Sequence, residues 1–272
     1  PLMYAKLLAY EIRSRYRADA RSFGAFIVTI AAASGIVAAG LPGISGSTAV
    51  LAYALCALTP VACAIAAMAD YWKTLYGQRG YFTMSLPVSG TTIFWAKTTR
   101  MVIECLLALA LAVGGIIAVA SAAAWSDGIS LAEYTAGPRS LVAGVPTSTV
   151  AIMIVVQVLV SLSWLVQGSA VMSIGAEGRF NHMGFGAPII GFVLLYIVNQ
   201  VLSTVGTFFL PLSVTTDGHF STEIMWTSYL ATMGTEGQPN VIGIGSYVLV
   251  PLFALVMAIW ASRSIEKHTS LR

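Results

Sequence analysis

Charged residues are scarce in this chain. They make up only 9% of its 272 residues, whereas hydrophobic residues make up 57%. Soluble globular domains carry about 25% charged residues, and the mean hydropathy here is +0.83. We therefore expect an all-α integral membrane protein rather than a soluble domain. The net charge of +3 does not indicate a nucleic-acid-binding surface.

The sequence also lacks the motifs of an ATPase or a metalloenzyme. No Gly-x-x-x-x-Gly-Lys-Ser/Thr loop is present to hold nucleotide phosphates. The three histidines, His182, His219 and His268, lie in three different polar segments, and the three cysteines show no Cys-x-x-Cys spacing. We expect no enzymatic activity, no metal and no cofactor in this chain.

Six apolar runs organise the whole chain as one transmembrane domain. A helix needs about 20 apolar residues to cross a bilayer, and runs of roughly this length recur six times. The predicted spans are residues 23–41, 48–69, 101–124, 149–174, 188–210 and 246–261.

Basic residues fall almost entirely on one side of these spans. If the N-terminus is cytoplasmic, thirteen of the fourteen lysines and arginines lie on the cytoplasmic side, and only Arg139 lies outside. An even number of spans returns the C-terminus to the same side. We predict a bacterial plasma-membrane protein with both termini in the cytoplasm.

Residues 1–21 precede the first span and predict an amphipathic helix. Its apolar residues recur every fourth position, and its basic residues lie on a neighbouring face. These residues are Leu8, Ile12 and Tyr16, and Lys6, Arg13 and Arg17. We expect this helix to lie in the headgroup region with its basic face toward anionic lipid; the alternative is a solvated basic leader.

The longest polar interruption in the first half covers residues 70–100, between spans two and three. Gly77, Gly80 and Pro87 are residues that end helices, so they predict a short helix from Gln78 to Leu86. Ser89 then predicts the N-cap of the helix that leads into the third span.

This interruption resembles the loop between spans two and three of ABC-2-type exporter permeases. The resemblance lies in Gly80-Tyr81, in Ser85-Leu86-Pro87-Val88-Ser89, and in Lys97, where the helix resumes. It covers about a tenth of the chain closely, and the arrangement of six spans extends it to nearly all of it.

The resemblance implies a function as well as a fold. In that family the short cytoplasmic helix is a coupling helix that docks on a separate ATPase subunit, and an N-terminal elbow helix lies along the cytoplasmic face. It implies a partner ABC ATPase that binds ATP and Mg, and a second copy of this permease or a related permease. The residues expected to couple the two subunits are Arg79, Tyr81, Phe82, Met84, Leu86 and Pro87.

Two further groups of residues are candidate functional sites. Glu104 lies four residues after Arg100, so we expect an ion pair that is structural or that has a gating role. The fifth span carries uncharged polar residues, for which hydrogen bonds between helices are the first explanation. The resemblance implies that this span faces the transport pathway, with Tyr196, Asn199, Gln200 and Ser203 as lining residues.

Residues 211–245 form the longest predicted extracytoplasmic loop. The stretch Ile224 to Leu230 is apolar and aromatic but too short to span, so it predicts a re-entrant or interfacial helix capped by Ser221 or Thr222. The alternative is a surface loop with a buried aromatic patch.

The sequence therefore predicts the permease subunit of an ATP-driven exporter of hydrophobic or amphipathic compounds such as drugs, antimicrobial peptides or lipid-like molecules. An ion-coupled carrier or a channel is the second interpretation. Against it, no ionisable residue lies in the middle of a predicted span, where such residues mark ion paths. A third interpretation is a membrane immunity or assembly factor that does not transport. No residue selects the cargo.

Overall fold

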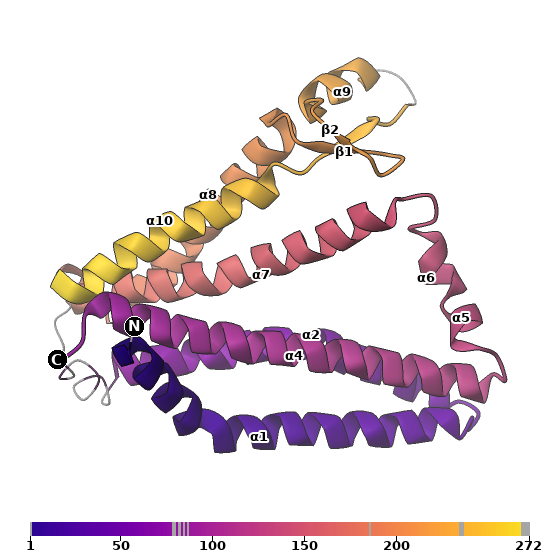
Figure 1. The fold of residues 1–272 in the computed structure, drawn as a ribbon, viewed down its shortest axis with the longest axis horizontal. Coiled ribbons are helices and arrows are strands. Elements are labelled where there is room, and N and C mark those ends of the chain that lie inside the picture. The colour runs from indigo at the N-terminus through magenta and orange to yellow at the C-terminus, as the bar shows by residue number, and fades with distance from the viewer. Residues whose placement is uncertain are drawn as a thin grey trace. The chain divides into compact units, whose positions relative to one another are not determined.

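The computed structural model describes residues 2–77, 80, 83, 85, 87–184, 186–233 and 237–267. These residues are mostly helical (Figure 1). The chain divides into two compact units, Pro1–Gly77 with Trp95–Leu141 and Gln78–Phe94 with Val142–Arg272. Each unit is described by itself below.

Six helices of the described residues are long and apolar enough to cross a membrane. This fits the predicted all-α membrane protein, and the number of these helices equals the number of predicted spans. The helices also expose large apolar side chains: Val28, Leu51 and Ile65 are 69%, 70% and 65% exposed. Such faces are stable against lipid tails, because apolar side chains that face lipid are not exposed to water.

The first unit is built on three long helices. They are α1 (Leu2–Ala38), α2 (Ser45–Leu75) and the part of α4 (Gly90–Ser126) that begins at Trp95. Gly40 and Gly43 have φ of +63° and +75° between α1 and α2, a conformation that lets the chain reverse there. Two short helices, α5 (Leu131–Tyr134) and α6 (Ala136–Ser140), follow α4.

The N-terminal segment is continuous with the first span. The sequence predicts a separate helix over residues 1–21, but α1 runs without a break from Leu2 to Ala38. No proline lies between Arg21 and Phe26, and Gly24 is helical, so nothing stops the helix there. Figure 1 shows that α1 instead bends near its N-terminal end.

A small apolar cluster joins the three helices. It consists of Phe26, Ile30, Ala52, Cys56, Ala112 and Val119. Gly115 lies in the same layer, where an added Cβ would be 2.7 Å from the Cys56 sulfur. α2 and α4 can approach this closely because position 115 has no side chain.

Helical residues extend into the predicted 70–100 coupling region from both sides. α2 continues to Leu75, and α4 begins at Gly90, directly after the predicted cap Ser89. Ser89 caps α4 as predicted, because its Oγ accepts a hydrogen bond of 3.3 Å from the Thr92 N–H.

The second unit packs three long helices. α10 (Ser246–Lys267) lies against both α7 (Thr147–Gly175) and α8 (Gly186–Phe209), and a 3-10 helix, η1 (Gly178–Met183), connects α7 to α8. Gly206 and Gly245 bring the end of α8 against the start of α10, since an added Cβ on Gly245 would meet the Gly206 carbonyl.

The described residues of the 211–245 loop form a small α/β element that the all-α prediction missed. A three-stranded antiparallel sheet has the order β2 (Phe220–Ser221), β1 (Ser213–Thr215), β3 (Val241–Gly243), with Ser213 opposite Ser221 and Gly243. Strands this short carry too few residues for an alternating pattern.

The predicted short helix in this loop is present as α9 (Met225–Thr232), but its predicted cap is wrong. Ile224 occupies the N-cap position and makes no side-chain capping bond. Ser221 cannot cap α9 because it belongs to β2, where its Oγ accepts the Glu223 N–H at 3.1 Å. Phe208, Phe209, Trp226 and Tyr229 join α9 to the end of α8 by ring contacts.

Candidate functional site

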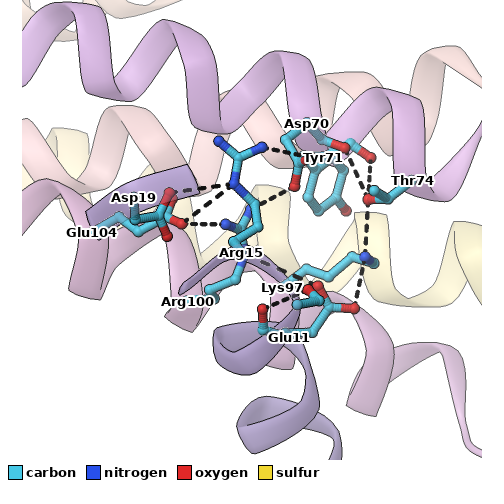
Figure 2. Close-up of polar contacts among 10 residues, drawn as sticks. Glu11, Arg15, Asp19, Asp70, Tyr71, Thr74, Lys97, Arg100 and Glu104 are labelled. Atoms are coloured by element: carbon cyan, nitrogen blue, oxygen red, sulfur yellow. Dashed lines mark hydrogen bonds and ion pairs between the residues drawn. The ribbon is translucent and has the colours of Figure 1, made fainter. Parts of the chain in front are cut away.

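Charged side chains from all three long helices of the first unit meet in one network (Figure 2). On α1, Glu11, Arg15 and Asp19 follow one another at four-residue spacing, which places them on one face of the helix. The buried stripe of α1 continues from this face into Phe26 and Ile30. The same helix face is therefore ionic at one end and apolar over the rest.

The other two helices supply the partners of these α1 residues. Asp70 and Thr74 lie one turn apart near the end of α2, and Lys97, Arg100 and Glu104 lie on consecutive turns of α4. Lys97 and Arg100 are each only 2% exposed and Glu104 is 7% exposed. A buried charge is stable only when it is paired, so the contacts of these groups determine whether the helices can pack here.

Lys97 joins all three helices. Its Nζ donates a hydrogen bond of 2.8 Å to Glu11 Oε1 on α1 and one of 2.9 Å to Thr74 Oγ1 on α2. The Thr74 hydroxyl in turn donates to the Asp70 carbonyl at 2.8 Å. The ammonium group therefore holds α1 against the end of α2.

Arg100 is the most enclosed cation of the network. Its Nη2 lies 3.0 Å from Asp70 Oδ2, its Nη1 pairs with Glu104, and Glu11 Oε2 lies 4.0 Å from its Nε. One guanidinium therefore contacts carboxylates from α1, α2 and α4. The predicted Arg100–Glu104 pair is present, and its gating role stays a prediction.

Arg15 covers the more open side of the network. Its Nη1 lies 2.7 Å from Asp70 Oδ1, and its Nε lies 3.5 Å from Asp19 Oδ1 and 3.8 Å from Glu104 Oε1. The Arg15 and Asp19 side chains keep 26% and 23% of their surface exposed. Four carboxylates thus face three cations, and the least enclosed carboxylate, Asp19, lies where solvent can stabilise the excess negative charge.

The ion pairs of this cluster hold three helices together. Its members are Glu11, Arg15, Asp19, Asp70, Thr74, Lys97, Arg100 and Glu104, and we call them the ionic joint. Each cation contacts at least two helices, so separating any helix from the others would leave a buried charge unpaired. Among the described residues, no group of three or more His, Cys, Asp or Glu could hold a metal ion.

The sequence predicts only the Arg100–Glu104 pair of this joint. The lysines and arginines of residues 1–21 predict a helix in the lipid headgroups instead. The signal that this prediction missed is that the two acidic residues of that segment, Glu11 and Asp19, are eight residues apart with Arg15 midway. That spacing aligns one mixed-charge face on a helix, opposite the mixed charges of residues 70 and 97–104.

The second unit contains a polar contact among its own helices. Gln167 on α7 donates to the Val250 carbonyl on α10 at 3.1 Å, and Asn199 on α8 donates to Gln167 Oε1 at 2.6 Å. Gln167 is fully buried and Asn199 is 2% exposed. These are the hydrogen bonds between helices that the sequence predicts for its uncharged polar residues.

The four predicted pathway residues on α8 do not share one environment. Asn199 is buried in the hydrogen bonds above, and Ser203 is half-buried. Tyr196 is 63% exposed, and Gln200 is exposed next to Asn199. The Tyr196–Gln200 face is therefore the one that α8 presents outside its own unit's core.

Most of the predicted ATPase-coupling residues lie outside the described residues. These are Arg79, Tyr81, Phe82, Met84 and Leu86. Pro87 is described, and it lies in a bend with an exposed side chain. The docking assignment accordingly stays a prediction.

Comparison of the chain with protein-family models, curated proteins and solved structures found no match.

Proposed function

We propose that this chain is the membrane subunit of an ATP-driven exporter of the ABC-2 type. It moves a hydrophobic or amphipathic compound out of the cell and works with a second permease, identical or related. Two partner ATPase subunits bind ATP and Mg and supply the energy. The segment around residues 78–86 receives the movement of the ATPase.

The observation that carries the proposal is where the ionic joint lies in the sequence. Its last residue before the coupling segment is Thr74 and its first residue after the segment is Lys97, and these two side chains are 2.9 Å apart. The segment is therefore a loop closed at its base by a buried contact. A force applied to the loop reaches α2 and α4 together, and Glu11 and Arg15 connect it to α1.

The downstream end of the loop is also supported within the second unit. Gly90, the first residue of α4, lies against α10, where an added Cβ would be 2.9 Å from the Glu266 nitrogen. Movement of the Pro87–Gly90 turn would therefore press directly on the end of α10. A loop held at both ends suits a part that receives force better than one that only links two spans.

The docking contact is the most direct test. An aromatic pair in a cleft of a partner is a typical centre of binding energy, so we expect Tyr81→Ala with Phe82→Ala to abolish co-purification of the ATPase and coupled transport. ATP hydrolysis by the ATPase alone should continue. A pull-down measures binding of the ATPase, and uptake into inverted membrane vesicles measures transport.

The matched control replaces two tyrosines that are exposed on α1. Tyr10 and Tyr16 are 56% and 67% exposed, so Tyr10→Ala with Tyr16→Ala removes two aromatic side chains elsewhere on the surface. Wild-type coupling in the Tyr81/Phe82 variant would refute the docking assignment. Binding of an ATPase without transport of any compound would favour the immunity or assembly factor.

The proposed orientation places both termini in the cytoplasm, and cysteine labelling tests it. Asp217 and Thr91 are exposed, and each is next to a glycine that has no room for a side chain. In a background without Cys56, Cys63 and Cys105, we expect Asp217→Cys to react with an impermeant maleimide on intact cells. Thr91→Cys should react only after permeabilisation, and the opposite pattern would reverse the topology.

A second candidate function has one specific observation in its favour. The ionic joint holds one more carboxylate than cations, and ion-coupled carriers bind protons or Na⁺ at carboxylates buried in their helices. The two functions respond differently to the energy source. Transport that stops with a proton uncoupler at constant ATP supports the carrier, and transport that stops only with ATP depletion supports the exporter.

A further inference from the structure

A cavity of about 460 Å³ opens in the second unit among α7, η1, α8 and α10. This lies in the range of small-molecule and cofactor sites, about 300–1,000 Å³. Its walls are almost wholly aliphatic or aromatic, with Ile190, Leu194, Met257 and Trp260 among the lining residues. Neither the ionic joint nor the predicted pathway residues take part in it.

Among the described residues, one charged side chain lines this cavity. Arg179, in η1, is 59% exposed, and its guanidinium lies over the Phe180 ring at 4.6 Å from the ring centre. The stacking fixes the guanidinium against the apolar wall. A cation held next to an apolar cavity matches a molecule with an anionic head and a hydrocarbon tail.

Glu177 contacts only the Nε atom of the Arg179 guanidinium. Its carboxylate lies 2.6 Å from Arg179 Nε, and its own side chain is 6% exposed. The two terminal guanidinium nitrogens have no hydrogen-bond or ion-pair partner among the described residues. Glu177 therefore orients the guanidinium through its Nε. Both Nη groups can still donate hydrogen bonds to a ligand, and their geometry suits two oxygens of one phosphate.

We infer that this cavity binds an anionic phospholipid, with one acyl chain among α7, α8 and α10 and its phosphate on Arg179. A lipid is the appropriate occupant because the three helices are apolar enough to span a bilayer, so acyl chains surround them. Trp260 is 49% exposed and Ile190 is 49% exposed, so the hydrocarbon can enter from the side of the helices. This site does not depend on the proposed exporter function.

The test uses the purified chain and two lipids with identical tails. Dioleoyl phosphatidylglycerol and dioleoyl phosphatidylcholine are titrated separately and bound lipid is counted by native mass spectrometry. We expect phosphatidylglycerol to bind about fivefold more tightly or better, because a charged hydrogen bond at an exposed site adds a modest preference. Equal affinity for the two lipids would overturn the headgroup assignment.

Two variants separate the head from the tail. Arg179→Gln should reduce phosphatidylglycerol binding to the phosphatidylcholine level, whereas Arg17→Gln, at an exposed arginine on α1, should leave the preference intact. Ile190→Trp should fill the cavity and lower the binding of both lipids. An unchanged preference in Arg179→Gln, or unchanged binding in Ile190→Trp, would refute the site.

Inorganic phosphate distinguishes a lipid site from a simple anion site. At millimolar concentration it should fail to displace phosphatidylglycerol, since the tail supplies most of the burial. Full displacement by phosphate would overturn the lipid assignment in favour of a free anion at Arg179.

Discussion

Arg100→Met is expected to destabilise the first unit by roughly 3–5 kcal/mol, the usual effect of removing one partner from a buried ion pair. The methionine has a similar volume but removes the buried cation that pairs with Asp70 and Glu104, and only the more exposed Arg15 still contacts both carboxylates. The variant should unfold at a clearly lower temperature in detergent, and coupled transport should fall with it. Thermal unfolding followed by tryptophan fluorescence measures the first effect.

Two further variants show that the effect comes from the unpaired charge. Arg13→Met removes an exposed arginine of α1 and should change the unfolding temperature little. Arg100→Met combined with Glu104→Gln removes a cation and a carboxylate together, so it should be more stable than Arg100→Met alone. If the double variant is as unstable as the single one, Arg100 acts by packing and not by charge.

Gly115→Leu is expected to separate α2 from α4 and to destabilise the first unit by about 1–3 kcal/mol, as overpacking of a core does. Its Cβ alone would lie 2.7 Å from the Cys56 sulfur and 3.4 Å from Phe26. Gly114→Leu is the matched control, because an added Cβ there has nothing within 4 Å and would face lipid. Both variants add the same apolar group to the same helix.

Comparing the two leucine variants isolates the close approach of the helices. We expect a lower unfolding temperature and weaker co-purification of the ATPase for Gly115→Leu only. Equal behaviour of the two variants would mean that α2 and α4 do not pack at this layer in the membrane.

The sequence predicts the large features of the fold because they follow from composition. Six apolar runs of spanning length are evident from the sequence. The bounds of α7 and α8 fall within a few residues of the predicted spans. The Ser89 cap was also predictable, since capping is local. The length of α1 was harder to predict. The helix continues past Ser22 because no helix-breaking residue lies there.

The ionic joint could be predicted only in part, because it needs contacts between distant segments. Arg100 and Glu104 are four residues apart on one helix, so their pairing is local. Glu11 and Lys97 are 86 residues apart, and their pairing depends on how α1 packs on α4. The small sheet was missed because its pairing depends on register between strands two or three residues long.

Asn199 illustrates the limit for pathway residues. A polar residue in an apolar span is compatible with lining a passage or with bonding a neighbouring helix, and the sequence alone treats both equally. Its side chain in fact donates to Gln167 and to the Leu195 carbonyl. Under the proposed function, the face of α8 that carries Tyr196 and Gln200 is therefore the better candidate for contacts with a transported compound.

The unbroken course of α1 has a mechanical consequence. Its buried stripe runs from Leu7 through Phe26 to Val37, and the helix bends near its N-terminal end but is not interrupted, so a rotation at one end is expected to be passed to the other. A rotation imposed on Glu11 and Arg15 is expected to be passed about seven turns along the helix, to the glycine turn that follows Ala38. Under the proposed function, α1 would therefore carry movement of the ionic joint along its whole length to the turn that leads into α2.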